Sequence, residues 1–226
     1  MAPTVHLQPT APLADRVLLP GDPGRALRLA QSLLAEPKMF NHHRGLWGYT
    51  GAATDGELLT IQSTGMGGPS AAIVLAELVD LGARRAIRVG TCGALAAGVQ
   101  LGALVVVTEA LAHDGTSRAL GAGDRVGADP ALSERLAGEH RGPVASSDLF
   151  YDPREPEAGW AAAGLLAVEM ECAAVFALAA ARGIRAAALL AVTDLVLPQR
   201  CRIDPAALTA AELRMGEVAL AALAPG

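Results

Sequence analysis

The chain has 226 residues, of which 52% are hydrophobic, so it can bury the core of one full domain, and this composition excludes a disordered or fibrous protein. The formal net charge of −5 provides no broad basic surface, which excludes nucleic acid and anionic membranes as expected partners. The longest apolar runs, such as 173–181, are much shorter than the ~18 residues that a membrane-spanning helix needs.

The cysteines and the first residues bear on the cellular compartment. Cys92, Cys172 and Cys201 form no CxxC pair and leave an odd thiol, which favours a reducing compartment over a disulfide framework. Residues 1–15 contain three prolines and lack the apolar segment of a signal peptide. We therefore expect a soluble cytoplasmic protein.

Short aliphatic runs alternate with longer alanine-rich amphipathic stretches, which predicts a single α/β domain over residues 1–226 with a sheet flanked by helices. In chain order, the expected elements are strand 16–19, helix 24–34, strands 48–53 and 58–63, helix 69–81, strands 86–89 and 103–108, helix 130–138, strand 165–169, helix 170–182, strand 186–192 and helix 205–224. The turn-rich segments 115–129 and 146–159 are expected to be binding or gating loops.

The first glycine-rich turn, LLPGDPGRA (18–26), joins a strand to a helix. Gly21 allows a ligand to approach the backbone, and Arg25 lies in the first helical turn, where free N–H groups and the helix dipole favour an anion. This arrangement suits a phosphate. An ordinary strand-to-helix turn with a solvated arginine explains these nine residues equally well.

The segment AIRVGTCG (86–93) places an arginine inside an apolar strand that we expect to end in a Gly-Thr-Cys-Gly turn. A buried guanidinium needs a partner, because leaving it unpaired is costly. Arg88 should therefore meet either a bound anion, with Thr91 and nearby N–H groups assisting, or a carboxylate in a structural salt bridge.

A third glycine-rich segment, STGMGGPS (63–70), resembles the dinucleotide fingerprint only superficially. Its last position is Ser70, and no acid that could bind a ribose follows in register, so a Rossmann cofactor is rejected. The chain also contains no P-loop sequence, which leaves ATP hydrolysis without support.

Two carboxylates stand at the junction of a strand and a helix in VEME (168–171). Because Glu169 and Glu171 project differently as strand becomes helix, one can serve the structure while the other accepts hydrogen bonds from a ribose diol. Taken alone, the pair is better explained as favourable charge at a helix N-terminus.

Asp194 follows an apolar run at the carboxyl end of a strand, which is where ligand sites of α/β sheets collect. An aspartate with an ordinary pKa of ~3.9 is a poor acid at neutral pH, so it would need an environment that favours its neutral form. A helix cap or a turn residue is an equally good interpretation of this position in isolation.

Other chemistries find no support in the sequence. His42 and His43 are adjacent, and no third ligand stands at a metal-binding spacing, so we expect no metal site. No nucleophile elbow and no recognisable cysteine-hydrolase motif occurs, which argues against covalent catalysis.

Taken together and in this order, seven segments resemble the nucleoside phosphorylase family, which includes the bacterial hexameric purine nucleoside phosphorylases and the uridine phosphorylases. They are LLPGDPGRA (18–26), NHHRGLWGYTG (41–51), TGMGGPSAAIV (64–74), IRVGTCGAL (87–95), SSDLFY (146–151), VEMECAAVFALA (168–179) and AVTD (191–194). The resemblance covers nearly the whole chain and implies the family's mixed sheet with a distorted barrel, flanked by helices.

The resemblance also implies a role for each matching residue. The expected phosphate-binding residues are Gly21, Arg25, Arg88 and Thr91, with Arg44 reaching in from a neighbouring subunit. The expected ribose-binding residues are Met66, Met170 and Glu171, with His6 lent by the neighbour to the 5′-hydroxyl. The expected base-binding residues are Cys92, Gly93, Phe150, Val168 and Asp194, and Asp194 is the acid that faces N7 of a purine.

The implied reaction is the reversible, phosphate-dependent cleavage of a purine ribonucleoside or deoxyribonucleoside into free base and sugar 1-phosphate. Inorganic phosphate is a co-substrate, no metal or organic cofactor is expected, and each active site needs two chains of a dimer that would assemble further into a hexamer. The alternatives are a uridine phosphorylase, a nucleosidase that uses water, and a non-catalytic nucleoside-binding protein.

Two departures from the family pattern leave questions open. Purine enzymes of this type usually carry an arginine, on the helix after the catalytic aspartate, that engages it when a lid closes. Here Arg200 and Arg202 are closer to Asp194 in the sequence than the family's arginine is to its aspartate. Either of them, or neither, could take the role of that arginine. The loop 150–155 lacks a clear copy of the glutamine and arginine that read a pyrimidine in uridine phosphorylases, although Arg154 keeps this reading open.

Overall fold

The structure is a computed structural model that describes residues 4–224. Its strands are β1 (Arg16–Leu19), β2 (Leu34–Asn41), β3 (Gly48–Ala53), β4 (Leu58–Gln62), β5 (Arg85–Ala94), β6 (Leu104–His113), β7 (Arg125–Gly127), β8 (His140–Ser147), β9 (Ala167–Glu169), β10 (Arg185–Leu195) and β11 (Cys201–Arg202). Its helices are α1 (Pro23–Leu33), α2 (Gly68–Leu81), α3 (Gly115–Ala119), α4 (Pro130–Glu134), α5 (Glu157–Ala162), α6 (Cys172–Arg182) and α7 (Pro205–Leu223), with a 3₁₀ turn at His43–Gly45.

All the strands belong to one mixed sheet that is partly closed into a barrel. β10, β6, β8, β9 and β5 pair in that order, and β10 also pairs with β5, which completes the ring. From β5 the sheet continues outward as β1, β4, β3 and β2. The α/β fold with a mixed sheet and a barrel flanked by helices is thus confirmed.

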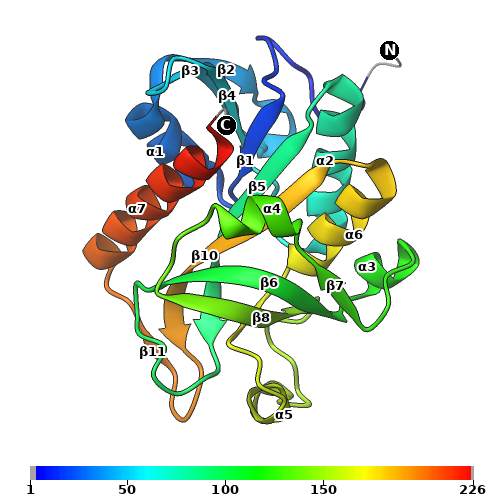
Figure 1. The fold of residues 1–226 in the computed structure, drawn as a ribbon, viewed down its shortest axis with the longest axis vertical. Helices are drawn as coiled ribbons and strands as arrows, with labels where there is room; N and C mark the ends of the chain where they lie inside the picture. The colour runs from blue at the N-terminus through cyan, green and yellow to red at the C-terminus, as the bar shows by residue number, and fades with distance from the viewer. Residues whose placement is uncertain (1–3, 225–226) are drawn as a thin grey trace.

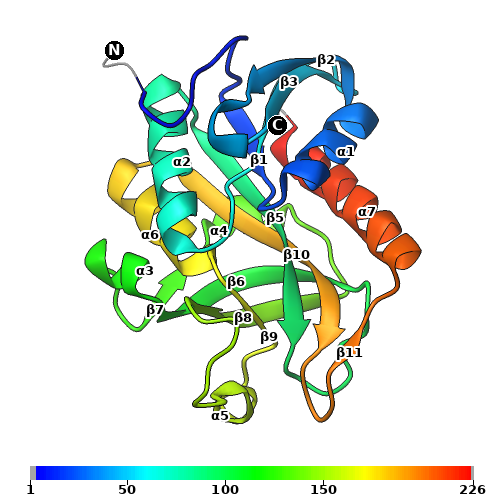
Figure 2. The same cartoon turned by 180° about the vertical axis from the view of Figure 1, so that it is seen from behind.

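Two layers of helices cover the sheet, with α1 and α7 side by side in one layer and α2 and α6 in the other (Figures 1 and 2). Strand β10 shows how both faces become buried. Its residues Ala188 and Leu190 pack into the core cluster shared with α2 and α6, while Ala187 and Leu189 pack into the cluster shared with α1 and α7. This two-residue alternation is typical of a strand covered on both sides. Within the described residues, no helix combines the length and apolarity that crossing a membrane requires.

Most predicted elements are present, and β1 and β3 have the predicted bounds. Strands β5 and β6 continue well past their predicted ends at 89 and 108, to Ala94 and His113. Prolines lie at the start of α1, α2 and α7, as expected for a helical position whose N–H would have no partner. The helix predicted over 130–138 is shorter, ending at Glu134. Strands β2, β7, β8 and β11 and helices α3 and α5 were not predicted.

One expectation about a turn is wrong, and the expectation about loops holds in part. The Gly-Thr-Cys-Gly segment is not a turn, because β5 continues through it to Ala94, paired with β10 on one side and with β9 on the other. The segment 115–129 contains α3 and β7, with irregular stretches at 120–124 and 128–129. The segment 146–159 contains the end of β8 and the start of α5, and its residues 148–156 are irregular.

Candidate active site

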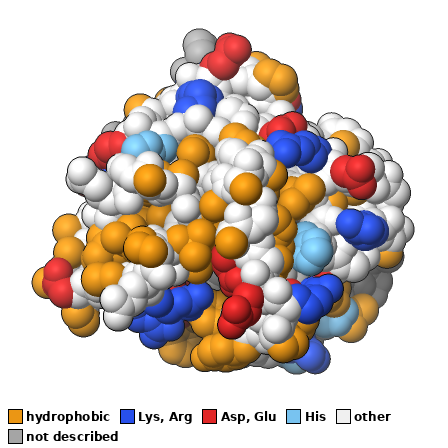
Figure 3. Space-filling model, turned by 90° about the horizontal axis from the view of Figure 1, so that it is seen from below, with side chains coloured by type: hydrophobic (Ala, Val, Ile, Leu, Met, Phe, Trp, Pro, Cys, Tyr) orange, Lys and Arg blue, Asp and Glu red, His pale blue; other side chains and the backbone are white. Residues whose placement is uncertain are grey.

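A cavity of about 460 Å³ is lined by residues that follow β1 and β9 and by the later parts of β5 and β10. The predicted site residues that line it are Gly21, Arg25, Met66, Arg88, Thr91, Cys92, Gly93, Phe150, Val168, Met170, Glu171 and Asp194. These residues come from six separate stretches of the chain, and the fold brings them together around one cavity. Figure 3 views the end of the molecule where α5 lies and shows hydrophobic side chains there with acidic and basic ones beside them.

The turn between β1 and α1 forms one wall of the cavity. The Asp22 side chain caps α1, accepting hydrogen bonds from the backbone N–H of Gly24 (3.2 Å) and Arg25 (2.7 Å). The expectation that N–H groups of the first helical turn stand free for an anion is therefore wrong for these two. The Arg25 side chain does line the cavity, and its Nε donates to Glu212.

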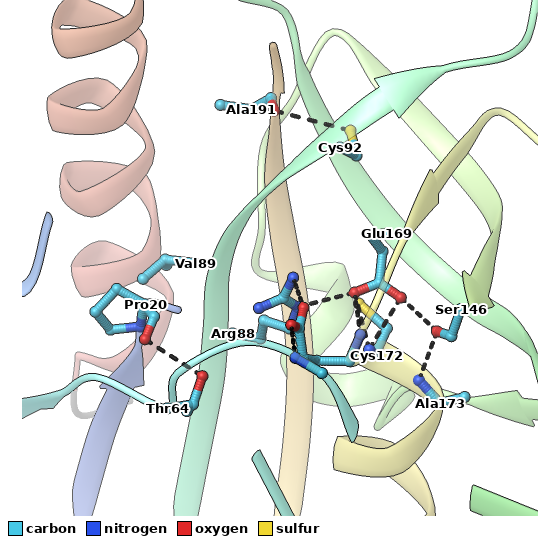
Figure 4. Close-up of polar contacts among 12 residues, drawn as sticks. Pro20, Thr64, Arg88, Val89, Cys92, Ser146, Glu169, Cys172, Ala173 and Ala191 are labelled. Atoms are coloured by element: carbon cyan, nitrogen blue, oxygen red, sulfur yellow. Dashed lines mark hydrogen bonds and ion pairs between the residues drawn. The ribbon is translucent and has the colours of Figure 1, made fainter. Parts of the chain in front are cut away.

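Arg88 lies in the middle of β5 and is held by two carboxylates (Figure 4). Its Nε donates to Glu169 at 3.0 Å, and its Nη2 pairs with Glu171. Burial alone would lower the pKa of Arg88, but the neighbouring charges of Glu171 and Glu169 raise it above its ordinary value. The structural salt bridge considered for this residue is present, and the guanidinium also lines the cavity.

The glycine two positions after Arg88 makes room for this guanidinium. A Cβ placed on Gly90 would lie 2.7 Å from Cζ of Arg88, so any larger residue would displace the side chain. Residues two apart in a strand share a face, and Arg88 therefore folds along β5 over Gly90 towards the carboxyl end of the strand.

The two carboxylates of the 168–171 segment have different hydrogen-bond partners, and the ribose-binding role of Glu171 stays a prediction. Glu169 accepts the backbone N–H of Glu171 (2.8 Å) and of Cys172, and also the hydroxyl of Ser146 (Figure 4). It thereby fastens the start of α6 to the barrel. Glu171 accepts the backbone N–H of Gly67 at 2.5 Å, and burial raises its pKa against the opposing effect of Arg88.

Asp194 lies within β10, where a register shift against β5 falls between Val192 and Asp194, so the cap and turn interpretations are wrong. It is 9% exposed and accepts a hydrogen bond from the Thr193 hydroxyl at 2.8 Å. Arg200 approaches it, with 3.3 Å between Nη1 and Oδ2. The same guanidinium lies over the ring of Phe150, 5.3 Å from its centroid.

This geometry answers part of the question about the arginine partner. Arg200 pairs with Asp194, whereas Arg202 stands opposite Asp194 in the β10–β11 pairing without an ion pair to it. Arg154 pairs instead with Asp152, 2.6 Å away, and does not line the cavity. Arg154 therefore gives no support to the hypothesis that the substrate is a pyrimidine nucleoside.

The rest of the cavity wall is largely apolar. Val168 and Phe150, predicted to face the base, are joined by Trp160 of α5 and Val196. Burial raises the pKa of the Cys92 thiol, which favours its protonated form. Its side chain is part of the cavity lining.

Two predicted residues, His6 and Arg44, lie outside the cavity. His6 is held on α2 by Glu77, whose carboxylate is 2.7 Å from Nδ1 and also accepts the backbone N–H of His6 and Leu7. Arg44 is exposed on the 3₁₀ turn with a φ of 58°. Their proposed roles in a neighbouring subunit stay predictions.

Several cavity residues were not predicted as ligands. They are Asp22, Pro23, Gly65, Gly90, Ser147, Leu149, Glu157, Trp160, Glu169, Thr193, Val196 and Arg200. Half of them stand directly beside a predicted residue in the sequence, and that proximity was the available signal. Glu157 lies in the segment 146–159 that was expected to be a binding or gating loop, whereas nothing in the sequence marked Trp160.

A family model described as the Phosphorylase superfamily matches residues 15–224, which is nearly the whole chain. The chain belongs to the phosphorylase superfamily. This membership agrees with the resemblance carried by the seven segments, and the matched region contains every cavity residue named above.

Curated relatives within this superfamily align over most of their lengths. The chain is 40% identical over 185 residues to a guanosine phosphorylase of Halorubrum lacusprofundi, covering 77% of this chain and 76% of that protein. It is 35% identical over 206 residues to a DeoD-type purine nucleoside phosphorylase of Geobacillus kaustophilus, covering 86% and 87%. A crystal structure of uridine phosphorylase from Vibrio fischeri has the same fold, with a TM-score of 0.84 and 28% identity over 93% of this chain and 92% of that one.

Proposed function

We propose that the protein is a purine nucleoside phosphorylase, which cleaves a purine ribonucleoside or deoxyribonucleoside with phosphate to give free base and sugar 1-phosphate. The observation that carries the proposal is one cavity with two buried guanidinium groups, of Arg25 and Arg88, and a carboxylate, Asp194, further along the same pair of strands. The purine specificity is supported by the guanosine and purine nucleoside phosphorylases among the relatives.

The strand register supplies the spacing that this chemistry needs. Gly90, over which the Arg88 guanidinium folds, lies three residues before Gly93, which pairs with Asp194 beyond the register shift. At the usual rise of a strand, three residues correspond to roughly 10 Å. This length accommodates a phosphate, a ribose and a base in line, with Glu171 and Met170 beside the sugar.

The proposed mechanism follows from the charges that develop in the transition state. As the glycosidic bond lengthens, the ribose becomes cationic and the base anionic, so a phosphate held beneath the sugar and an acid beside the base both lower the barrier. Arg25 and Arg88 hold the phosphate, which is both the nucleophile and the counter-charge. When a nucleoside is bound, a hydrogen bond from Asp194 to N7 of the base favours the protonated carboxyl. Asp194 gives this proton to N7 as the base leaves, and Arg200 stabilises the carboxylate that remains. The reaction requires no metal or organic cofactor.

A panel of inosine, guanosine, adenosine and uridine, each with and without phosphate, tests the proposal. We expect base release from the purine nucleosides to require phosphate and to yield one sugar 1-phosphate for each base. Release at the same rate without phosphate would identify a nucleosidase. Tight nucleoside binding without any product would identify a binding protein.

A uridine phosphorylase is the second candidate, favoured by the structural similarity to the Vibrio fischeri enzyme. In the same panel, a higher kcat/KM on uridine than on inosine would establish it. The position of Arg154 outside the cavity is the observation that ranks it second.

Arg200 should matter for turnover on purine nucleosides, and Arg202 should not. We expect Arg200→Gln to lower kcat on inosine about tenfold, because one charge-assisted contact to the Asp194 carboxylate is lost. The matched control, Arg202→Gln, removes an equal charge two residues away and should leave kcat within about twofold. Equal losses in the two variants would mean that only the net charge of this loop matters.

We propose further that the enzyme works as a homodimer and that three dimers assemble into a hexamer. We expect it in the cytoplasm. Around the phosphate end of the cavity, three arginines (Arg25, Arg28 and Arg88) face three glutamates (Glu169, Glu171 and Glu212), so the single chain offers no excess of positive charge there. A phosphate dianion needs a further cation. The exposed Arg44 of a neighbouring subunit fills this need.

Exposed hydrophobic side chains mark the face by which the dimer would form. Met66 is 86% exposed and Trp47 41% exposed, while Ile73 lies on α2 one turn before the residue that holds His6. Ile73 therefore lies on the same helix as the partner of His6, and Trp47 follows closely after Arg44 in the sequence. Apolar side chains of this size on a protein surface are typical of subunit interfaces.

Mixing two inactive variants tests whether subunits share sites. Arg44→Ala and Asp194→Asn should each abolish most turnover on inosine. In a symmetric dimer that combines one chain of each kind, one of the two sites is fully wild type, so random mixing should restore about a quarter of wild-type activity. Mixtures no more active than the sum of the separate variants would show that Arg44 serves its own chain or none.

A further inference from the structure

Glu212 is a buried carboxylate on α7 that reaches the proposed phosphate site through another residue. It is 1% exposed, and its Oε1 accepts a hydrogen bond from Nε of Arg25 at 2.7 Å. Its Oε2 accepts one from Nη2 of Arg28 at 2.6 Å and one from Nε of Arg28 at 3.1 Å. Glu212 itself does not line the cavity, so it can influence a ligand there only by way of Arg25.

The close packing of α7 on α1 brings this carboxylate into place. A Cβ added to Gly216, one turn after Glu212, would lie 2.5 Å from Cδ2 of Leu29, which is one turn after Arg25. The glycine therefore allows the two helices to approach until the Glu212 side chain is enclosed between them. A carboxylate enclosed in this way is tolerated only when it is paired, and the two arginines of α1 provide the pairing.

The contact with Glu212 determines which edge of the Arg25 guanidinium faces the cavity. A guanidinium has five N–H donors in one rigid plane. Glu212 takes the donor on Nε, and Nη1 lies 3.5 Å from the carbonyl oxygen of Val89. Nη2 has no acceptor among the described residues. Arg25 thus turns its Nη edge towards the cavity wall shared with Gly21 and Arg88.

We infer that Glu212 is a positioning residue for phosphate: it fixes the plane of the Arg25 guanidinium so that the Nη edge meets the oxyanion. The inference rests on the proposed function, because it takes phosphate as the ligand of Arg25. Arginine recognises phosphate through paired N–H donors in a set geometry, so a guanidinium that is free to rotate binds it less well. Arg28 holds the second carboxylate oxygen and keeps Glu212 from following Arg25 towards the ligand.

The positioning effect and the simple charge effect of Glu212 have opposite signs. Removing a negative charge behind Arg25 should by itself strengthen phosphate binding. Arg28 already neutralises Glu212 at 2.6 Å, which leaves little of that gain to be made. By contrast, the hydrogen bond that Nε of Arg25 donates to Glu212 is lost without a replacement. Weaker phosphate binding is therefore the expected net result.

The test is Glu212→Gln, with steady-state kinetics in which phosphate and inosine are varied separately. We expect KM for phosphate to rise about tenfold, the effect of one charge-assisted hydrogen bond, while KM for inosine stays within about twofold. The matched control is Glu217→Gln, the same change at an exposed position of the same helix, which should alter neither constant. A general loss of structure would instead lower kcat and raise both KM values together.

Three outcomes would overturn the inference. An unchanged KM for phosphate would show that Arg25 is held without Glu212. A lowered KM would show that Glu212 acts only through its charge. If Glu212→Gln does not fold, Arg28→Gln at the half-exposed partner takes its place, with an expected rise of about threefold in KM for phosphate alone; no rise there would also refute the inference. A wild-type protein that releases base without phosphate would refute the proposed function instead, and the two failures are thereby distinguishable.

Discussion

Asp194→Asn is expected to lower kcat on inosine by about two to four orders of magnitude, the usual contribution of a general acid. The variant keeps the shape of the side chain and the neighbouring Thr193 and Arg200, so KM for inosine should change little. Steady-state phosphorolysis measured by hypoxanthine release gives both constants. Asp204→Asn, an exposed helix cap that an asparagine can still fill, is the matched control and should retain wild-type turnover.

A second substrate separates the loss of the acid from a general loss of the site. 7-Methylguanosine carries a positive charge on its base and leaves as a neutral molecule without a proton at N7. Asp194→Asn should therefore lose much less activity on 7-methylguanosine than on inosine. Equal losses on the two nucleosides would mean that Asp194 supports the site in another way than by giving a proton.

Arg88→Met is expected to have the largest effect on stability together with a loss of phosphorolysis. The change leaves the buried carboxylates of Glu169 and Glu171 without their cation, and breaking a buried ion pair in this way costs about 3–5 kcal/mol of unfolding free energy. Urea denaturation measures the loss. Arg85→Met on the same strand removes a pair with the exposed Asp15, and it should cost no more than about 1 kcal/mol.

The double variant Arg88→Met, Glu169→Gln separates stability from function. Replacing a charged partner by a neutral one removes part of the desolvation cost, so stability should recover in part. Turnover with phosphate should not recover, because the guanidinium that meets the oxyanion is still absent. Recovery of both properties would mean that Arg88 serves only to neutralise Glu169 and Glu171.

Strong local patterns allowed most of the fold to be predicted, and weak ones account for what was missed. Strand β2 is an edge strand whose Glu36, Pro37 and Lys38 face solvent, so no apolar alternation marks it. Strand β8 contains the dipeptide Gly142-Pro143, which normally indicates a turn. Both segments become strands because neighbouring strands pair with them, and the chain sequence around them does not contain that information.

Site residues could be predicted where a charged residue stood in an apolar segment of the sequence. An arginine in an apolar strand implied a buried partner. In the structure the partners of Arg88 are Glu169 and Glu171, from the segment 168–171 whose carboxylates the sequence had already marked as site candidates. The contact between Arg25 and Glu212 joins residues 187 positions apart, so no spacing rule could reveal it. The sequence of this turn indicated an anion site, and that interpretation did not include the role of Asp22 as the cap of α1.

A crystal structure with phosphate and an unreactive nucleoside analogue tests the central claim most directly. We expect one oxyanion in contact with the Nη atoms of Arg25 and with Arg88, beneath the anomeric carbon, and Asp194 within hydrogen-bond distance of N7 of the purine. The contradicting result would be nucleoside in the cavity with no anion beside Arg25 and Arg88, and with Arg25 still paired with Glu212 and Arg88 with Glu169 and Glu171.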